Sequence, residues 1–439
     1  MKIAVIGTGY VGLVSGACFS HLGFDVVCVD QNAEKIRSLE KGAIPIYEPG
    51  LEPIILENRD KGRLSFTTDL RQACGGAAII FIAVGTPTDE KTGQADLTSV
   101  FDAGRQIAPF LETYAVVVIK STVPVGTSLR LHDIILETNA KAQFDIASNP
   151  EFLREGSAVE DFLRPDRVVI GLSSKKAEVL MRELYRPLSD HAVPLVITSS
   201  ASAEMIKYTA NCYLAMRIGF VNQVSDVCEA VGADIGEVAL GVGLDRRIGQ
   251  HYFAPGPGIG GSCFPKDTLA MVAIAQDHHV SMSIIEEFVV ANDKRRQNVA
   301  HKIVAAMGGN IRGKKIAIFG IAFKANTDDI RDSAAIIVIP LLQQMGALIS
   351  AYDPAAMDHG RNTFQNVKWC EDPYEAAKDA ESVVILTEWK EFREIDFQQL
   401  KAIMRISLIV DFRNLYLPEA VSDAGFSYHS MGRAAVAIQ

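Results

Sequence analysis

The N-terminal part of the chain alternates short apolar runs with stretches in which apolar residues recur every three or four positions. The opening run, KIAVI at residues 2–6, leads through a glycine turn and a helical pattern to a second run that ends at Asp30. Similar runs follow at residues 78–84, 115–120, 144–148 and 167–171. Because unbroken apolar runs are typical of parallel strands covered on both faces, this order predicts a doubly wound α/β domain over residues 1–199.

The middle of the chain has a helical period instead. No proline or glycine occurs between Ala201 and Gly219, and the apolar residues recur every three to four positions. This pattern predicts one long helix that ends at Gly232. A second helical pattern covers residues 281–307, with a glycine-rich segment before it. We therefore expect a central helical domain over residues 200–308.

The last part of the chain returns to strands and helices. Its opening, KIAIFG followed by GALISAYD, is similar to KIAVIG followed by GFDVVCVD at the N-terminus. The similarity indicates an internal repeat, although any two α/β domains look somewhat alike at this level. It predicts a second Rossmann-like doubly wound domain over residues 309–439.

The composition of the chain excludes several classes of protein. A chain of 439 residues is long enough for two or three domains, and its net charge of −10 argues against nucleic-acid binding. The longest apolar runs are far shorter than the roughly 18–20 residues of a membrane span, and the first expected strand begins at Lys2, so we expect neither a membrane segment nor a secretory leader. Seven scattered cysteines without a CxxC pair predict a reduced, cytoplasmic chain with no metal site.

The first glycine turn has the pattern G-x-G-x-x-G between a strand and a helix. Its residues are Gly7, Gly9, Tyr10, Val11 and Gly12. Such a turn lets a dinucleotide pyrophosphate approach the backbone at a helix N-terminus. Asp30, at the end of the second strand, is placed to accept the ribose hydroxyls and to repel a 2′-phosphate, so we predict NAD rather than NADP. Lys35 could face the same end of the cofactor; the alternative is a turn that has lost its cofactor.

Two threonine-containing segments follow later strands of the same domain. VGTPTD contains Thr86, and KSTVPVGT contains Thr122 and Thr127. Ligands bind at the carboxyl ends of parallel strands, so Thr86 and Thr122 are candidates for cofactor and substrate contacts. Helix capping is the alternative, above all for Thr127.

Two charged patterns come next. NPEFLREGSA carries Glu151 and Glu155, which would share one face if the segment is helical and could then position a water or accept a proton. An ordinary solvated helix start is the alternative. KYTAN places Lys207 and Asn211 on one face of the long helix, where they could stabilise an alkoxide. A lysine lying along the surface is the competing interpretation.

Cys263 lies in the segment GIGGSCFPKD. Gly260 and Gly261 would let a substrate come close, since they carry no Cβ. Lys266 and the start of a helix near Asp267 would lower the pKa of the thiol, as a nucleophilic cysteine requires. A buried, inert cysteine is the alternative.

Eight segments occur in the order seen in nucleotide-sugar dehydrogenases: GTGYVG, YEPGL, VGTPTD, KSTVPVGT, NPEFLREG, KYTAN, GIGGSCFPKD and AFKANTDDIRDS. The chain thus resembles the UDP-glucose/GDP-mannose dehydrogenase family over about residues 1–414. GGSCFPKD resembles the UDP-glucose type, because members that oxidise N-acetylated sugars usually have histidine before the cysteine. GDP-mannose enzymes tend to have leucine after the cysteine, and GDP-mannose is the alternative substrate.

The resemblance implies an NAD-dependent four-electron oxidation of UDP-glucose to UDP-glucuronate. Cys263 would hold the C6 aldehyde as a thiohemiacetal, and further oxidation would leave a thioester that water hydrolyses. Lys207 would stabilise the oxyanion, and Asp267 would act as base or position the water. The supporting residues implied are Asn211 and Thr122, which would hold the same oxygen or a water, and Glu155, which would assist hydrolysis.

The resemblance also implies binding residues. Those at the nucleotide sugar are Glu151, Phe152, Leu153, Glu155, Lys207, Asn211, Arg247, Gly260, Lys324 and Arg413. Those at NAD, beyond the glycine turn, are Thr86, Thr122, Glu155, Lys266 and Arg331. Arg247 would reach into a neighbouring subunit, which implies a homodimer or larger homo-oligomer with the long helix at the interface. Solvated surface arginines are the alternative for Arg247 and Arg413.

The third domain lacks G-x-G-x-x-G, and its turn reads GIAFK at residues 320–324. This difference fits a site for UDP, with backbone N–H groups helping to bind the pyrophosphate. Two other functions stay open at this level. One is a two-electron hydroxy-acid dehydrogenase in which Cys263 only packs, and the other is an NAD-binding scaffold without catalysis.

Overall fold

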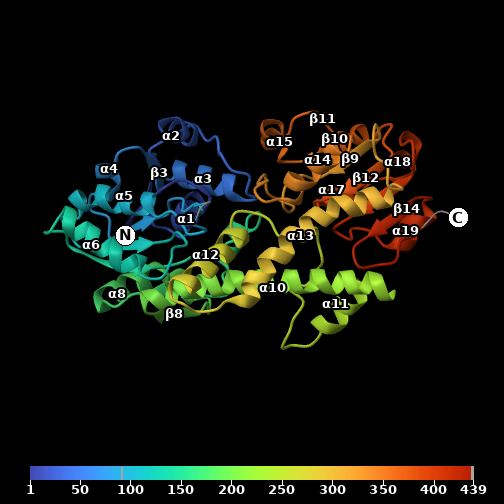
Figure 1. Ribbon diagram of the computed structural model, residues 1–439. Coiled ribbons are helices and arrows are strands. Elements are labelled where there is room, and N and C mark those ends of the chain that lie inside the picture. The colour runs from blue at the N-terminus through green and yellow to red at the C-terminus, as the bar shows by residue number, and fades with distance from the viewer. Residues whose placement is uncertain (90–91, 437–439) are drawn as a thin grey trace. The chain divides into compact units, whose positions relative to one another are not determined.

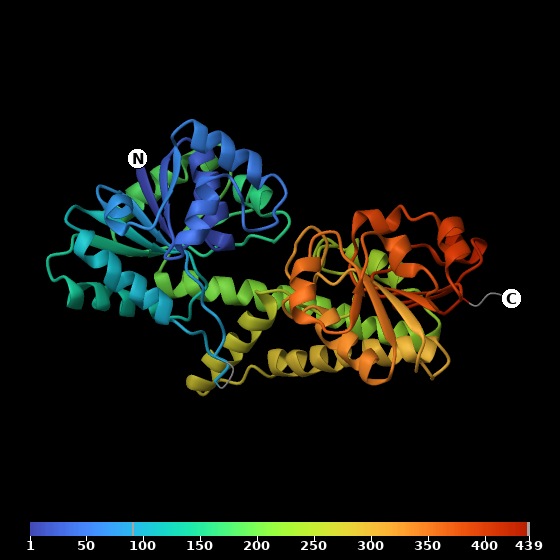
Figure 2. The same ribbon diagram turned by 90° about the horizontal axis from the view of Figure 1, so that it is seen from above.

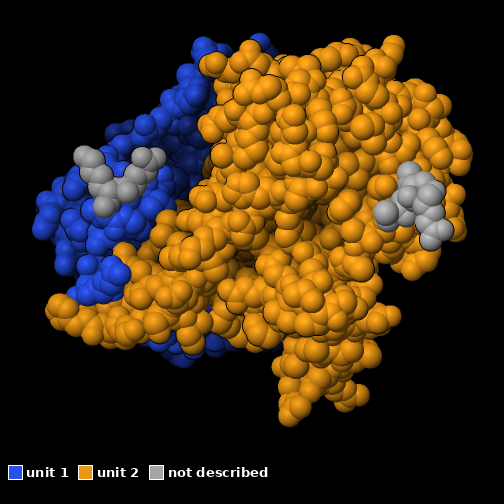
Figure 3. All heavy atoms as spheres, turned by 45° about the vertical axis from the view of Figure 1, so that its right-hand side comes forward, with its two compact units in different colours: residues 1–210, 276–278 blue, residues 211–275, 279–439 orange. Residues whose placement is uncertain are grey.

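The computed structural model describes residues 1–89 and 92–436, and the chain divides into two compact units (Figure 1). One unit comprises residues 1–210 with 276–278, and the other comprises residues 211–275 with 279–439 (Figure 3). The long helix α10, Ser200–Val231, begins in the first unit and ends in the second. The predicted long helix is therefore confirmed.

The first unit is built on a sheet with the strand order β3-β2-β1-β4-β5-β6-β7-β8. Neighbouring strands are parallel except β6 and β7. The strands are β1 Lys2–Ile6, β2 Asp25–Val29, β3 Leu64–Thr67, β4 Ile79–Ile82, β5 Ala115–Ile119, β6 Phe144–Ser148, β7 Val168–Gly171 and β8 Leu195–Thr198. Ile3 and Val5 of β1 join one core while Ala4 and Ile6 join another, so both faces of the sheet are covered, as the apolar run predicts.

Helices connect these strands. They are α1 Tyr10–His21, α2 Ala33–Glu40, α3 Leu51–Asp60, α4 Leu70–Cys74, α5 Thr98–Ile107, the 3-10 turn Ala108–Phe110, α6 Thr127–Thr138, α7 Ala158–Leu163, α8 Lys175–Leu184 and α9 Arg186–Ser189. Several start at a side chain that accepts a hydrogen bond from the first turn, as capping residues do. In this unit they are Asn32 before α2, Asp69 before α4 and Ser174 before α8.

The second unit contains a parallel sheet with the order β11-β10-β9-β12-β13-β14, whose strands lie side by side (Figure 2). The strands are β9 Lys315–Phe319, β10 Leu348–Tyr352, β11 Val367–Trp369, β12 Ser382–Ile385, β13 Leu408–Asp411 and β14 Ser427–Ser430. The helices are α11 Ile235–Gly243, α12 Phe264–Asp277, α13 Ser283–Ala306, α14 Ala334–Gln344, α15 Met357–Thr363, α16 Pro373–Ala377, α17 Lys390–Arg393, α18 Phe397–Ile403 and α19 Pro418–Asp423. The last two residues of α12, Gln276 and Asp277, belong to the first unit.

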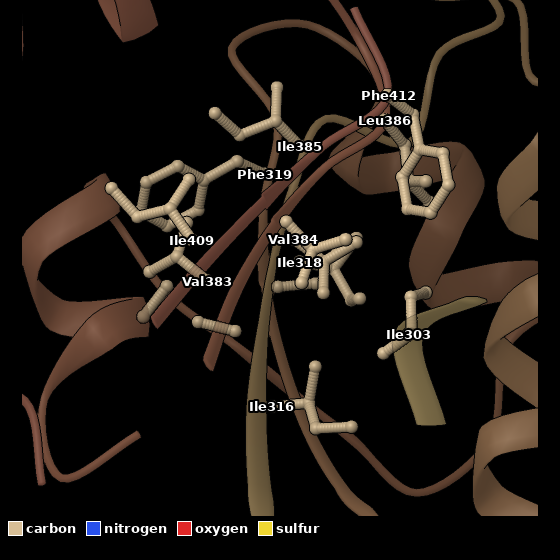
Figure 4. Close-up of a cluster of buried hydrophobic side chains, with 14 of the residues drawn as sticks. Ile303, Ile316, Ile318, Phe319, Val383, Val384, Ile385, Leu386, Ile409 and Phe412 are labelled. Carbon is tan, nitrogen blue, oxygen red and sulfur yellow. The ribbon is translucent and has the colours of Figure 1, made fainter. Parts of the chain in front are cut away.

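The core of this sheet is formed by its strands, by the helices that cover them and by α13. Ile316 and Ile318 of β9 and Val384 of β12 belong to one continuous buried cluster that also includes Ile303 of α13 (Figure 4). The central helices and the last α/β domain thus share apolar side chains that a separate domain would expose to water.

The two sheets share equivalent hydrogen bonds at their central glycine turns. In the first sheet Gly7 donates its N–H to the carbonyl of Val29 at 2.7 Å, and in the second sheet Gly320 donates to Tyr352 at 2.9 Å. Each glycine ends the central strand and each acceptor ends the neighbouring strand. The order of strands is also the same from the first edge inwards, so the predicted pair of Rossmann-like domains is confirmed.

Within the described residues, no helix combines the length and the apolar character needed to cross a membrane.

Candidate active site

The glycine turn after β1 leaves room for a ligand at one position only. A Cβ on Gly7, whose φ is +98°, would lie 2.6 Å from the carbonyl oxygen of Ala83, and a Cβ on Gly12 would lie 2.0 Å from that of Gly7. These two glycines are therefore required by the protein's own packing. A Cβ on Gly9 would meet nothing within 4 Å. The open space at Gly9, beside the start of α1, suits a pyrophosphate held by first-turn N–H groups such as those of Tyr10 and Val11.

Asp30 ends the second strand as a firmly held carboxylate. It accepts hydrogen bonds from the N–H of Thr8 at 3.0 Å, from the Thr8 hydroxyl at 2.7 Å and from the N–H of Asn32 at 3.0 Å. Lys35 Nζ is 3.2 Å away. Burial alone would raise the pKa of Asp30, but these hydrogen bonds and the Lys35 charge outweigh it and lower the pKa to about 2. The residues present fit the adenosine end of NAD.

The two threonine segments meet at the ends of their strands. The Thr86 hydroxyl donates to the carbonyl of Thr122 at 3.0 Å, so Thr86 ties the two loops together. Thr127 is the first residue of α6 and donates to the carbonyl of Pro124. The cap of α6 is Glu204 of α10, which accepts from the N–H of Gly126 at 2.8 Å and from Ser128. Nothing in the local sequence identifies Glu204 as that cap.

The segment with the two glutamates is not helical before Ala158, so Glu151 and Glu155 do not share a helix face. Glu151 instead accepts from the N–H of Leu153 and from Lys207 Nζ at 3.1 Å. The Lys207 side chain is 3% exposed, so the interpretation as a surface lysine is wrong. This ion pair fixes the ammonium that would face a developing oxyanion.

The ring of Phe152 is close to two cations. The Arg167 guanidinium is 3.6 Å from the centre of its ring and Lys207 Nζ is 5.3 Å from it. Both contacts are of the cation–π kind. Phe152 therefore helps to hold Lys207 in place.

Lys120 was not singled out by the sequence, yet it is buried beside the same pair. Its Nζ donates to the amide oxygen of Asn149 at 3.1 Å. Burial lowers the pKa of Lys120, the Glu151 carboxylate raises it and the Lys207 ammonium lowers it, with the result at about 8. The first unit thus holds a carboxylate between two lysines, of which the sequence pattern indicated one.

In the second unit, Cys263 precedes α12 directly. Its carbonyl accepts the N–H of Asp267 at 2.9 Å, and the hydroxyl of Ser262 lies 3.6 Å from its sulfur. Cys263 is therefore at the N-terminus of a helix, where the helix dipole stabilises a thiolate. It is only half-buried, unlike the other six cysteines, which are all buried.

Asp267 is the centre of a polar cluster in the first turn of α12. The carboxylate, in a side chain that is 1% exposed, accepts from Asn211 Nδ2 at 2.6 Å and pairs with Lys266 Nζ at 2.6 Å. Three residues that the family resemblance implied are thus in direct contact. Lys266 pairs with this carboxylate, and its expected effects on the thiol and on NAD stay predictions.

The glycines before Cys263 are required by the packing of their own loop. A Cβ on Gly260 would lie 2.4 Å from the carbonyl oxygen of Asp332, and one on Gly261 would lie 2.8 Å from the ring of Phe323. The N–H of Gly261 also donates to the carbonyl of Arg331 at 2.8 Å. These glycines let the cysteine loop pack on residues 323–332, and their expected contact with a substrate stays a prediction.

Three cationic residues lie around that contact. Arg413 donates to the carbonyls of Phe323 at 2.6 Å and Leu386 at 2.7 Å, and its side chain is 17% exposed, so it is not a solvated surface arginine. Lys324 Nζ lies 5.6 Å from the centre of the Phe323 ring. Arg331 is exposed and pairs with Asp329.

The turn of the third domain has fewer available N–H groups than the sequence suggested. The N–H groups of Ile321 and Ala322 both donate to Asp353, at 2.7 and 3.0 Å. Asp353 follows β10 as Asp30 follows β2. These two N–H groups are thus already satisfied by the protein, and other groups must bind a pyrophosphate there.

Arg247 lies apart from these clusters. It is exposed and pairs with Asp245 at 2.6 Å, which agrees with a surface arginine in a single chain. Among residues 1–89 and 92–436, no group of three or more His, Cys, Asp or Glu side chains is arranged to hold a metal ion.

Comparison with known families gives three matches in order along the chain. They are to the UDP-glucose/GDP-mannose dehydrogenase family, with its NAD binding domain over residues 1–189, its central domain over residues 201–294 and its UDP binding domain over residues 317–418. Among solved structures, a UDP-glucose dehydrogenase from Pyrobaculum islandicum is similar with a TM-score of 0.91 and 36% identity, over 99% of this chain and 98% of that chain. A UDP-D-ManNAc dehydrogenase from Pyrococcus horikoshii reaches a TM-score of 0.87 at 26% identity, over 99% of this chain and 100% of that one.

Curated relatives agree over the full length. The UDP-glucose 6-dehydrogenase of Rhizobium meliloti (strain 1021) is 52% identical over 435 residues, which is 99% of this chain and 100% of the relative. That of Bacillus subtilis (strain 168) is 47% identical over 437 residues, which is 99% of this chain and 94% of the relative. This chain, with its NAD-binding N-terminal domain, therefore belongs to the UDP-glucose/GDP-mannose dehydrogenase family.

Proposed function

We propose that this enzyme oxidises UDP-glucose to UDP-glucuronate through a covalent intermediate on Cys263. The observation that carries the proposal is Cys263 at the N-terminus of α12, followed within one turn by the buried cluster of Asp267, Asn211 and Lys266. A cysteine that only packs does not need a helix N-terminus or a neighbouring buried carboxylate. The names of the curated relatives, with up to 52% identity, support UDP-glucose as the sugar.

Cys263 makes the second oxidation possible. NAD, when bound, accepts a hydride from C6 in each of the two oxidations. An aldehyde must gain a nucleophile before it can release a further hydride, and the Cys263 thiolate adds to the carbonyl carbon as a thiohemiacetal. Loss of the second hydride leaves a thioester, which water hydrolyses to the carboxylate while the sulfur leaves as a thiolate. From the thiohemiacetal to the thioester the sugar is bonded to Cys263, so the aldehyde does not escape.

The other residues stabilise charge and position water. Lys207, held by Glu151, would stabilise the oxyanion at C6. Asp267 would act as base or position the water, with Asn211 fixing its carboxylate. The supporting roles proposed from the family resemblance are Thr122 at the same oxygen or water, and Glu155 in thioester hydrolysis.

Binding of the two nucleotides would divide between the units. We place NAD on the glycine turn and Asp30, with further contacts from Thr86, Thr122, Glu155, Lys266 and Arg331. We place UDP-glucose on Lys324 and Arg413 of the last domain, with contacts from Glu151, Phe152, Leu153, Asn211 and Gly260. The boundaries 1–199, 200–308 and 309–439 are part of this proposal.

The test is to count NADH formed per UDP-glucose consumed and to repeat the measurement with Cys263→Ser. We expect two NADH per sugar from the unchanged enzyme. The variant should bind UDP-glucose with a Kd within about threefold of the unchanged enzyme, since the hydroxyl replaces only the sulfur, and should show no net turnover. One NADH per sugar, or normal turnover of the variant, would contradict the covalent mechanism.

A panel of sugars separates the alternatives. UDP-glucose should be oxidised in preference to GDP-mannose and UDP-galactose. Reduction of NAD with GDP-mannose alone would make the enzyme the other type in the family, and activity with a small hydroxy acid would favour a two-electron dehydrogenase. No reduction with any sugar would indicate an NAD-binding scaffold.

We further propose that the enzyme is a homodimer or larger homo-oligomer in the cytoplasm. Tyr213, Phe220 and Val227 are spaced seven residues apart on α10 and are 52%, 58% and 60% exposed. Large apolar side chains at this spacing form one stripe of a helix, and such a stripe is suited to packing against another helix. The occupant we propose is the same stripe of a second copy, with Arg247 reaching the partner's site. The seven free cysteines are in keeping with a reducing compartment.

A further inference from the structure

Glu48, in the segment YEPGL, has no role in the reaction described above. It lies in the loop between α2 and α3 and is buried. Its carboxylate accepts the N–H of Gly156 at 2.6 Å and that of Ala158 at 2.7 Å. It also accepts the hydroxyl of Tyr10. One buried carboxylate thus joins three segments that are distant in the sequence.

The first of these contacts fixes the start of α7. The residue before α7, Ser157, makes no capping hydrogen bond with its side chain, and Glu48 supplies acceptors for the N–H groups of Gly156 and Ala158 in its place. Gly156 has a φ of +80°, so the chain turns there through a conformation that suits glycine. The path of the backbone immediately after Glu155 is therefore determined by Glu48.

The second contact joins this path to the cofactor turn. Tyr10 is the first residue of α1 and follows Gly9 directly, where the space for a pyrophosphate is open. Its hydroxyl donates to Glu48 and accepts the N–H of Gly156 at 3.2 Å. Burial, Glu48 and the charge of Glu155 all raise the pKa of Tyr10, so the hydroxyl keeps its proton and remains a donor.

We propose that Glu48 is a positioning residue that, with Tyr10, fixes Glu155 beside the cofactor turn for hydrolysis of the thioester. The inference rests on the proposed function. In that step the water oxygen bonds to the thioester carbon, the bond from this carbon to sulfur breaks, and Glu155 accepts one proton from the water. The products are a carboxylic acid, which ionises to solvent, and the Cys263 thiolate.

Glu48→Gln tests the proposal by the intermediate that accumulates. The amide has a single acceptor oxygen, so one of the two backbone N–H groups would face its NH₂ group. Misplacement of a reacting group by about 1 Å can cost about 100-fold in rate, and we expect steady-state turnover to fall about 10- to 100-fold. Two NADH per active site should still form rapidly, and the fraction of acid-quenched enzyme that carries a sugar adduct on Cys263 should rise, as measured by mass spectrometry.

Tyr10→Phe gives a second, milder variant. It removes one hydroxyl and keeps both backbone hydrogen bonds to Glu48. The adduct should rise less than in Glu48→Gln, and this variant still tests the proposal if Glu48→Gln does not fold. An unchanged adduct fraction in every folded variant would overturn the proposal.

Asp411→Asn is the matched control. Asp411 is also a buried carboxylate that accepts two backbone N–H groups, of Arg413 and Leu415, and a tyrosine hydroxyl, of Tyr428. Asp411→Asn should displace Arg413, whose N–H the carboxylate accepts, and so raise the KM for UDP-glucose. The fraction of enzyme with a sugar adduct should not increase. An equal increase in adduct would show that Glu48 acts only through general stability. If the unchanged enzyme does not give two NADH per sugar, the proposed function fails instead.

Discussion

Single buried charges determine the chemistry that the first unit can support. Glu151 interacts with the ammonium groups of Lys207 and Lys120, and both lysines are buried. Removal of one partner from such a group leaves an uncompensated charge, which costs about 3–5 kcal/mol. The three residues therefore act as one unit, and Lys120 is part of it although it was not a candidate from its motif KSTVPVGT.

Lys120 predicts a distinctive dependence of stability on pH. Its pKa is about 8 in the folded protein and near its ordinary value of 10.5 in the unfolded chain. Between these values the unfolded state binds more protons, so the free energy of unfolding should rise with pH by about 1–2 kcal/mol between pH 8 and pH 9.5. Below about pH 7 both states are almost fully protonated and the contribution is constant.

Urea unfolding of the unchanged enzyme and of Lys120→Met at several pH values checks this. The unfolding free energy of the variant should not rise between pH 8 and pH 9.5. The difference in unfolding free energy between the two proteins should therefore change over this pH range. A difference that stays constant from pH 7 to pH 9.5 would show that Lys120 keeps its ordinary pKa.

At the scale of elements, helices are joined by side chains from distant segments. Glu204 of α10 caps α6, and Glu48 supplies acceptors at the start of α7. The short helices of this domain thus depend on long-range contacts. Such helices are too short to be stable alone, because helix nucleation is costly.

Glu204→Ala should therefore destabilise the NAD-binding domain. It would leave the N–H groups of Gly126 and Ser128 without their buried acceptor, at a cost of about 2–3 kcal/mol. Asp69→Ala removes an exposed cap of α4 and should cost about 1 kcal/mol or less. The urea midpoint of each variant measures the difference, and equal shifts would contradict a special role for Glu204.

Helices and strands with a strong hydrophobic periodicity could be predicted from the sequence. Those with a weak periodicity could not. The long helix α10 and the strand β1 have unbroken patterns and were found. The edge strands β8 and β11 are short and only partly buried, so they lack the apolar run on which strand prediction depends. Likewise, the tail after Tyr416 showed no motif, yet its Arg433 pairs with Asp234 at the start of α11.

The residues of the candidate site also differ in how far the sequence predicts them. Motifs located the cysteine, the lysine of KYTAN and the glycine turn, because each has a fixed local spacing. They did not indicate the partners of Lys120, Glu204 or Glu48, because these contacts join residues about 29 to 108 positions apart. Only the segment YEPGL gave a signal for Glu48, and it did not indicate what that residue contacts.

For the whole molecule, the exposed stripe of α10 is the feature with the largest consequence. Phe220 is near its middle and lies 6.4 Å from the ring of Phe253 in the same chain. In a monomer the outer part of this ring would remain in water. A second copy would bury it together with Tyr213 and Val227.

Phe220→Glu should convert the dimer into monomers, because the charge would be buried at the proposed interface without a partner. Light scattering after size-exclusion chromatography measures the mass. Leu129→Glu, at an apolar side chain of α6 that is 74% exposed, is the matched control and should leave the mass unchanged. A monomeric wild-type protein, or a dimeric Phe220→Glu variant, would rule out this interface.

The packing of the cysteine loop on residues 323–332 also affects how relatives can diverge. Gly260 and Gly261 tie the reactive thiol to the domain that we propose binds the sugar nucleotide, and both belong to one compact unit. A change of sugar can therefore be inherited together with the thiol that acts on it. The dinucleotide half carries the proposed contacts of Glu151, Phe152, Leu153 and Lys207, so an exchange of that half near residue 210 would have to keep these residues.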